Sequence, residues 1–178
     1  AVYVDRTRYI DTRWYAGSGI YRNVKLIVTG QVHTPIWSTT IKTVDVESDQ
    51  AKLIVESTVK NDVAQAYSLN ILTSIQDSSG QMVSSSHTQL RVEANTKKAF
   101  QQDISLPKPQ LWDIDSPSLY SAKIEIFNGK QLLDSTETRF GVRTLKNDPN
   151  LGFFLNGKNL KIKGVNLHHD AGLVGSAV

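Results

Sequence analysis

A short polar run near the end of the sequence holds its densest set of side chains that could do chemistry. Asn166, His168, His169 and Asp170 supply an amide, two imidazoles and a carboxylate. Such groups can hydrogen-bond a substrate, bind a metal ion or take part in a catalytic triad. The run directly follows residues 160–165, whose alternating apolar side chains predict a strand. The candidate groups therefore lie at the end of a predicted strand.

A metal site and a serine-hydrolase triad both fit this run poorly. Adjacent residues on extended backbone point to opposite sides, so at most one histidine and Asp170 could converge, and a zinc site would need two further ligands. Gly172 and Gly175 have the wrong spacing for the Gly-x-Ser-x-Gly turn that presents a nucleophilic serine. Two interpretations remain open: a polar strand end that faces solvent, and a strand end that binds substrate.

Composition limits the classes of partner. Of the 178 residues, 39% are hydrophobic and 21% are charged, and no apolar run is long enough to cross a bilayer. The net charge of +3 is spread along the chain without the aromatic interleaving of a nucleic-acid surface. Cysteine is absent, so there are no disulfides or thiolate sites, and the compartment is not determined by redox chemistry. We expect no nucleic acid and no membrane among the partners.

Extended structure should position these groups, because hydrophobic alternation with a period of two dominates the middle of the sequence. Residues 120–126 show the cleanest alternation of a half-buried strand. In all, the pattern predicts about seven strands. They are residues 36–46, 52–60, 67–76, 83–92, 98–106, 120–126 and 131–141.

The connections between these strands contain turn-forming residues. Asn128-Gly129 is the strongest hairpin signal, while Pro107 and Pro109 predict a long connection, underneath which Trp112 packs. About seven short strands with short turns favour an all-β fold, an immunoglobulin-like antiparallel β-sandwich without the disulfide of antibody domains. A barrel is the alternative.

Both ends of the chain depart from this pattern. The first thirty or so residues contain two strand-like segments, 2–4 and 24–28, and two strands cannot bury a face alone. At the other end, Asn156-Gly157 predicts a type I′ hairpin turn, after which the chain runs into the polar cluster. The ends therefore look like parts of neighbouring domains.

Four ordered segments resemble glycoside hydrolase family 2, which includes β-galactosidases, β-glucuronidases and β-mannosidases. They are residues 13–24 (RWYAGSGIYRNV), 111–120 (LWDIDSPSLY), 139–143 (RFGVR) and 154–170 (FLNGKNLKIKGVNLHHD). The resemblance implies that residues 1–30 are the end of a jelly-roll sugar-binding domain, 31–143 an immunoglobulin-like sandwich, and 144–178 the lead-in and first strand of a (β/α)8 catalytic barrel.

The resemblance also implies a role for the polar cluster. Barrel enzymes place their chemistry at the carboxyl ends of strands. In β-galactosidase-like members, the histidine that matches His168 hydrogen-bonds the substrate as positive charge develops on the sugar ring. His168, with Asn166 and Asp170, is therefore our predicted substrate-binding set. Leu167 and His169 depart from the commonest Asn-Arg-His-Glu form of the motif, and the form present here looks most like a β-galactosidase subgroup.

Catalysis needs groups that the chain does not supply. Retaining glycosidases use two carboxyl groups about 5 Å apart, and the resemblance places them as glutamates on later barrel strands. The glutamates present all fall in the sandwich region, where alternation predicts solvent-facing positions: Glu47, Glu56, Glu93, Glu125 and Glu137. We therefore predict no catalytic residue, no metal and no cofactor in this chain, and no activity of the chain alone.

Two roles for the chain remain to be compared. The first is a structural spacer that supports the barrel of a parent β-galactosidase acting on a β-galactoside-type carbohydrate; a β-glucuronidase or β-mannosidase is the variant of that idea. The second is a carbohydrate-binding or adhesive module that uses Trp14, Tyr15, Trp37 or Trp112. A separate expectation concerns the ends of the chain. Residues 1–30 and 144–178 should lack structure, or should pair with the sandwich or with another copy of the chain. A periplasmic or secreted parent is one expectation for the compartment.

Overall fold

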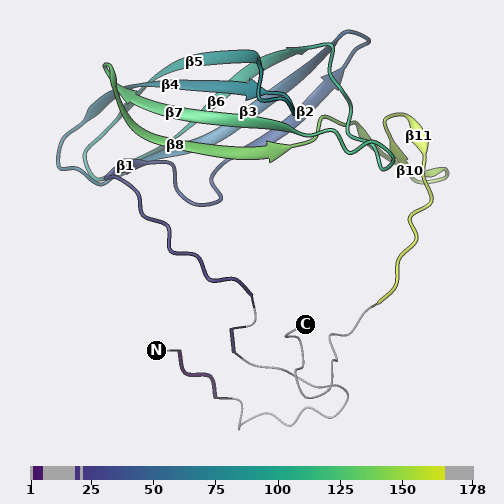
Figure 1. Cartoon of the computed structure of the whole chain (residues 1–178), viewed down its shortest axis with the longest axis horizontal. Coiled ribbons are helices and arrows are strands. Elements are labelled where there is room, and N and C mark those ends of the chain that lie inside the picture. The colour runs from purple at the N-terminus through teal and green to yellow at the C-terminus, as the bar shows by residue number, and fades with distance from the viewer. Residues whose placement is uncertain (1, 6–18, 21, 167–178) are drawn as a thin grey trace. The chain divides into compact units, whose positions relative to one another are not determined.

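The computed structural model describes residues 2–5, 19–20 and 22–166. The chain divides into two units, Thr29–Lys161 and the two terminal stretches Ala1–Val28 and Ile162–Val178. All the strands of the described residues lie in the first unit (Figure 1). That unit contains residues 31–143, the range expected to be a sandwich, together with residues 144–161.

The first sheet is built around one long strand. β3 (Gln50–Asn61) pairs along its whole length with β6 (Thr96–Pro107), from Gln50↔Pro107 to Asn61↔Thr96. Its other edge is shared by β1 (Val32–His33) and β2 (Thr40–Val46). All these pairings are antiparallel, and in the β2–β3 pair a short turn joins the two strands.

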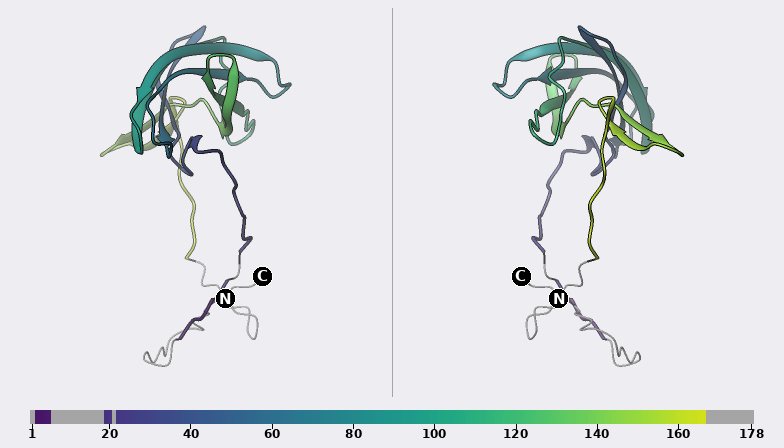
Figure 2. Two further views of the ribbon diagram at one scale, coloured as in Figure 1. Left: turned by 90° about the vertical axis from the view of Figure 1, so that its left-hand side faces the viewer. Right: turned by 90° about the vertical axis from the view of Figure 1, so that its right-hand side faces the viewer.

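The second sheet has the order β5-β4-β7-β8. Its strands are also all antiparallel, and they are β4 (Tyr67–Gln76), β5 (Met82–Val92), β7 (Tyr120–Asn128) and β8 (Gln131–Phe140). The two sheets face each other as curved layers, which the side views show (Figure 2). The fold is therefore an all-β, immunoglobulin-like sandwich.

The core fills the space between the layers with alternate side chains of each strand. In β3 every second residue is buried, and the same alternation runs through β7. The largest fully buried side chains come from both layers, and each such aliphatic side chain contributes roughly 1.5–3 kcal/mol on burial. They include Leu53, Val55, Val59, Leu69, Ile71, Ile75, Val92, Leu106, Ile124, Ile126 and Val142.

Polar side chains also connect the two sheets, at the edge where β5 faces β6. Gln102 of β6 is 3% exposed. Its amide nitrogen donates to Thr88 Oγ1 at 3.0 Å and to the Ile71 and Ser86 carbonyls at 3.4 Å. Ser84 Oγ of β5 also donates to the Ser105 carbonyl of β6 at 2.7 Å. The β5 and β6 edges are thus joined by hydrogen bonds across the sandwich.

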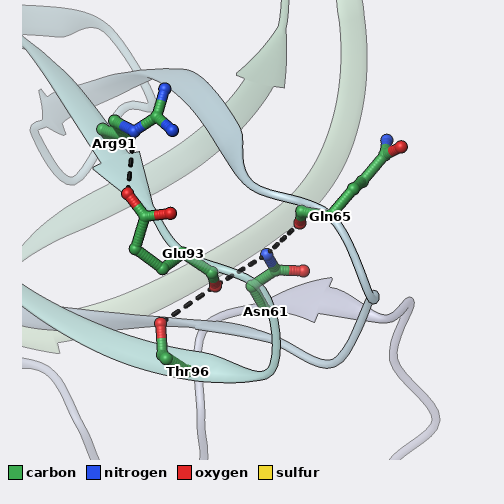
Figure 3. A network of polar contacts seen from close by, with 5 residues as sticks. All are labelled: Asn61, Gln65, Arg91, Glu93 and Thr96. Carbon is green, nitrogen blue, oxygen red and sulfur yellow. Dashed lines mark hydrogen bonds and ion pairs between the residues drawn. The ribbon is translucent and has the colours of Figure 1, made fainter.

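A buried asparagine joins two turns at one end of the sandwich (Figure 3). Asn61 is 0% exposed, and its Nδ2 donates to the Gln65 carbonyl at 2.8 Å and to the Glu93 carbonyl at 3.0 Å. Its Oδ1 accepts from the Val63 amide at 3.0 Å. Nearby, the hydrogen bond and charge of the Glu93 carboxylate raise the pKa of Arg91 above its ordinary value. Asn61 thereby ties the β3–β4 turn to the β5–β6 turn.

A second, smaller sheet follows the sandwich. We call it the meander: β9 (Leu145–Asp148), β10 (Gly152–Leu155) and β11 (Lys158–Asn159), paired in the order β11-β10-β9. Its β10–β11 turn contains Asn156 and Gly157 at φ 50° and 76°, the positive values that a type I′ turn needs. The hairpin predicted at Asn156-Gly157 is confirmed.

The seven predicted strands are all present, with small shifts at their ends. The strand predicted over 36–46 begins only at Thr40, because Pro35–Ser38 form a turn in which Trp37 has a φ of 58°. The β7–β8 hairpin is present, but Asn128 pairs with Gln131, so the turn is centred on Gly129 and Lys130.

Both the terminal stretches and residues 145–159 differ from prediction. The strands predicted at 2–4, 24–28 and 160–165 are not strands where the structure describes those residues. Residues 145–159, in contrast, are not structureless and do not add to a sandwich sheet, because they pair with one another as the meander. β9 itself was not anticipated, although Pro149, Asn150 and Gly152 are turn residues that could have indicated a hairpin.

Candidate functional site

The predicted substrate-binding cluster lies at the limit of the described residues. Asn166 is exposed and outside any strand, while His168 and Asp170 lie beyond the residues that the structure describes. Among the described residues, the backbone hydrogen bond closest in sequence to the cluster runs from the Leu160 amide to the Phe153 carbonyl, at 2.8 Å. The convergence of Asn166, His168 and Asp170 therefore stays a prediction.

Residues 141–143, where the sandwich ends, lie against Trp112 of the β6–β7 connection. We call Trp112, Gly141, Arg143 and Asn156 the junction. The Trp112 amide donates to the Val142 carbonyl at 2.8 Å, and the neighbouring Leu111 forms a parallel bridge with Val142. The Arg143 guanidinium carbon lies 5.0 Å from the centre of the Trp112 ring, within cation–π range. Trp112 is half-buried and lies close to both Gly141 and Arg143.

Gly141 is required at the junction by space rather than by backbone conformation. A Cβ on this residue would lie 2.7 Å from Trp112 Cβ and 2.8 Å from Trp112 Cγ. Real Cβ atoms do not approach other carbons so closely, so only glycine allows the Trp112 side chain its place. The segments 111–120 and 139–143 that carry the family resemblance thus meet here.

The glutamates of the sandwich are not arranged as a catalytic pair. Four of them pair with a lysine or arginine: Lys42 with Glu56, Lys52 with Glu47, Arg91 with Glu93 and Lys123 with Glu125. Glu137 instead accepts a hydrogen bond from Ser121 Oγ at 2.6 Å. None of the five is buried, in agreement with the predicted solvent-facing positions.

The residues that the structure describes contain neither a metal cage nor a membrane-spanning helix. No three histidine or carboxylate side chains among them are grouped so that they could hold a metal ion. Within the same residues, no helix has the length and hydrophobicity needed to cross a bilayer.

The tryptophans suggested for sugar stacking have different surroundings. Trp37 is 98% exposed at the tip of the β1–β2 loop. Trp112 has one contact surface taken by Gly141 and Arg143, while Trp14 and Tyr15 lie outside the described residues. Of the described pair, Trp37 is the one free to stack on a ligand.

Comparison with known proteins decides the family. The family model described as Glycosyl hydrolases family 2 matches residues 34–143, most of the sandwich. The chain belongs to this family. Family 2 membership accounts for the sandwich and for the segments 111–120 and 139–143 that meet at the junction.

Relatives within family 2 include both galactosidases and glucuronidases. The chain is 38% identical over 178 residues to the β-galactosidase BoGH2A of Bacteroides ovatus, covering 100% of this chain and 21% of that protein. It is 34% identical to a putative β-glucuronidase of Formosa agariphila, covering 99% of this chain and 16% of that protein. The chain thus spans about a fifth of the length of these relatives.

Solved structures agree with this assignment. A family 2 glycosyl hydrolase from Bacteroides cellulosilyticus matches with a TM-score of 0.86 and 32% identity, over 92% of this chain and 23% of that one. A β-glycosidase from Bacteroides vulgatus matches with a TM-score of 0.77 and 32% identity, over 93% of this chain and 20% of that one.

Proposed function

We propose that this chain is a segment of a β-galactosidase-like retaining glycosidase in which the sandwich supports a catalytic barrel. The observation that carries the proposal is the 38% identity along the whole chain to a β-galactosidase of which it covers only 21%. Residues 1–30 would then end a jelly-roll domain, 31–143 would be the spacer, and 144–178 would lead into the barrel.

The chemistry divides between this chain and the rest of the enzyme. Retaining hydrolysis needs one carboxyl group to protonate the leaving oxygen and another, about 5 Å away, to attack the anomeric carbon. The five glutamates of this chain lie unburied on the sandwich, hydrogen-bonded to serine or paired with basic side chains. Both catalytic carboxyls would therefore come from other parts of the enzyme, and this chain alone should be inactive.

The chain would contribute hydrogen bonds to the sugar. His168 would interact with the substrate hydroxyls as the ring gains oxocarbenium character, with Asn166 and Asp170 beside it. Such a contact strengthens in the transition state, so its loss lowers kcat/KM. The Leu167 and His169 variant of the motif and the Bacteroides ovatus relative both favour a β-galactoside, while the Formosa agariphila relative makes a β-glucuronide the alternative.

Chromogenic substrates test this proposal. The full-length enzyme should hydrolyse an aryl β-galactoside with a kcat/KM at least about tenfold above that for the β-glucuronide, because a site built for one hydroxyl pattern leaves polar groups unpaired with the other. The 178-residue chain should show no turnover. Preference for the glucuronide would change the assigned sugar, and turnover by the chain alone would contradict the division of labour.

Substitution separates the roles of His168 and the sandwich. His168→Ala in the full-length enzyme should reduce kcat/KM by about a hundredfold or more, as expected when a transition-state contact is removed. The matched control is His87→Ala, an exposed histidine of β5, which should leave activity unchanged. Removal of residues 31–143 without loss of stability or activity would refute the spacer role.

One observation favours a second candidate function, a carbohydrate-binding module. Trp37 is 98% exposed, and an exposed indole can stack on the apolar face of a sugar. Titration calorimetry of the chain against β-galactan, compared with Trp37→Ala, decides this function. Binding that the substitution abolishes would establish the module, and absence of binding would eliminate it.

A further inference from the structure

Asn156 does more than form a hairpin turn. Its Nδ2 donates to the Trp112 carbonyl of the sandwich at 2.9 Å, and its Oδ1 accepts from the Thr144 amide at 3.0 Å. Its own amide donates to the Thr144 carbonyl at 2.9 Å. One residue therefore holds the meander turn, the strand entry before β9 and the β6–β7 connection together.

The sandwich side of these contacts is firmly held. Trp112 is anchored by the backbone bond to Val142, which is 0% exposed, and its side chain contacts Gly141 and Arg143. Its carbonyl is thus a fixed acceptor. Because this acceptor does not move, a hydrogen bond to it restricts the position of the Asn156 side chain that donates the bond.

The two ends of the meander differ in burial. Leu155, next to Asn156, is 5% exposed, whereas Leu151 in the opposite turn is 66% exposed. The Asp148 carboxylate accepts from the Asn150 and Leu151 amides at 3.0 Å, so that outer turn is closed by its own residues. The Asn156 end is therefore where the orientation of the meander is set.

We propose that Asn156 is a positioning residue that fixes the meander to the sandwich and so sets the direction in which the chain leaves β11. This inference rests on the proposed function, since it assigns the meander a task in presenting the sugar-binding residues. β11 ends at Asn159, a few residues before Asn166, so a rotation of the meander moves the start of that segment. A displacement of about 1 Å can reduce the rate a hundredfold when it affects groups that contact the reacting centre.

The first test measures orientation in the 178-residue chain. In Asn156→Gly, the turn backbone is preserved because glycine readily adopts the positive φ of 50°, and only the side-chain bonds are lost. The matched control is Asn159→Gly, which removes an amide-to-carbonyl bond of Nδ2 to Leu151, at 2.6 Å, inside the meander. Residual dipolar couplings of the β9 and β10 amides are compared with those of β3, β4 and β7.

A single alignment tensor should fit the sandwich and the meander in the wild type and in Asn159→Gly. In Asn156→Gly, the couplings of β9 and β10 should fall at least twofold while those of the sandwich stay unchanged. Equal couplings in the two variants would overturn the inference. The measurement needs no enzymatic activity, so its outcome does not depend on the proposed function.

The second test uses the full-length enzyme. Asn156→Gly should lower kcat/KM at least tenfold relative to Asn159→Gly, with melting temperatures of the two variants within a few degrees of each other. Equal activities of the two variants would refute the positioning role. A full-length protein without glycosidase activity would instead refute the proposed function, and the dipolar couplings would still decide whether Asn156 fixes the meander.

Discussion

Substitution of Gly141 by alanine should destabilise the sandwich through contact with Trp112. The added Cβ would lie 2.7 Å from Trp112 Cβ, 2.8 Å from Cγ and 3.0 Å from Cδ1. Rotation of the indole can relieve the last two contacts but not the first, because Trp112 Cβ moves only with the backbone. That backbone is held by the 2.8 Å bond from the Trp112 amide to the Val142 carbonyl.

The size of the effect follows from two opposing contributions. Overpacking of this kind costs about 1–3 kcal/mol. Replacing glycine at an ordinary φ also restricts the unfolded chain, which stabilises by about 0.4–1 kcal/mol. The net loss should be about 1–2 kcal/mol, a fall of roughly 2–8 °C in the melting temperature of a domain of this size.

Urea denaturation and thermal melting measure this difference. The matched control is Gly30→Ala, where the nearest atom to the added Cβ is the Leu133 carbonyl oxygen at an ordinary 3.6 Å. This variant should be neutral or slightly more stable. In a Trp112→Gly background, Gly141→Ala should cost almost nothing, because the colliding atoms are gone. Equal stability of Gly141→Ala and Gly30→Ala would show that the contact with Trp112 is not what excludes a side chain.

Two further predictions concern the turns of the sandwich. Asn61→Ala should lower the free energy of unfolding by about 2–4 kcal/mol, since three hydrogen bonds of a buried side chain are lost: those to the Gln65 and Glu93 carbonyls and that from the Val63 amide. Asn70→Ala, an exposed position on β4, should change stability by less than about 0.5 kcal/mol in the same urea titration. A loss no larger than that of the control would contradict the role of Asn61 in joining the turns. The hydrogen bond from Ser79 Oγ, followed by the amides of Gln81 and Ser79, lowers the pKa of Asp77 below its ordinary 3.8. The stabilisation by Asp77 should therefore be complete above pH 3.8 and disappear as the pH falls through the lower folded-state value, so the stability difference between wild type and Asp77→Asn should shrink only in that acid range. If wild type and Asp77→Asn differ in stability by the same amount at neutral pH and below the folded-state pKa, the ionised carboxylate of Asp77 does not stabilise the turn.

Local sequence was enough to predict the strands of the sandwich. Alternation identified β4 at Tyr67–Gln76 and β7 from Tyr120, because one face of each strand is buried and the register admits no slip. The Asn156-Gly157 turn followed from the positive φ values that these two residues tolerate. Such signals depend only on neighbours along the chain.

Features that depend on residues far apart in the sequence could not be predicted from local patterns. Residues 160–165 alternate like a strand, yet a strand also needs a partner edge, and alternation does not reveal whether one is present. Gln102 of β6 occupies an inward position that the pattern assigns to an apolar side chain, and its acceptors belong to the opposite sheet. The contact of Asn156 with Trp112 likewise joins residues far apart in the sequence.

The pairing of β3 with β6 also has a consequence for how the sandwich folds. These strands are separated by the β4–β5 hairpin, so each pair in their register closes a loop, and the loop is shortest at Asn61↔Thr96 and longest at Gln50↔Pro107. Because the entropy lost on closure grows with loop length, pairing should start at the Asn61 end and proceed toward Gln50. Asn61 holds together the two turns that flank this first pair. Its interactions would then form early on the folding pathway, and their loss would slow folding more than it would accelerate unfolding.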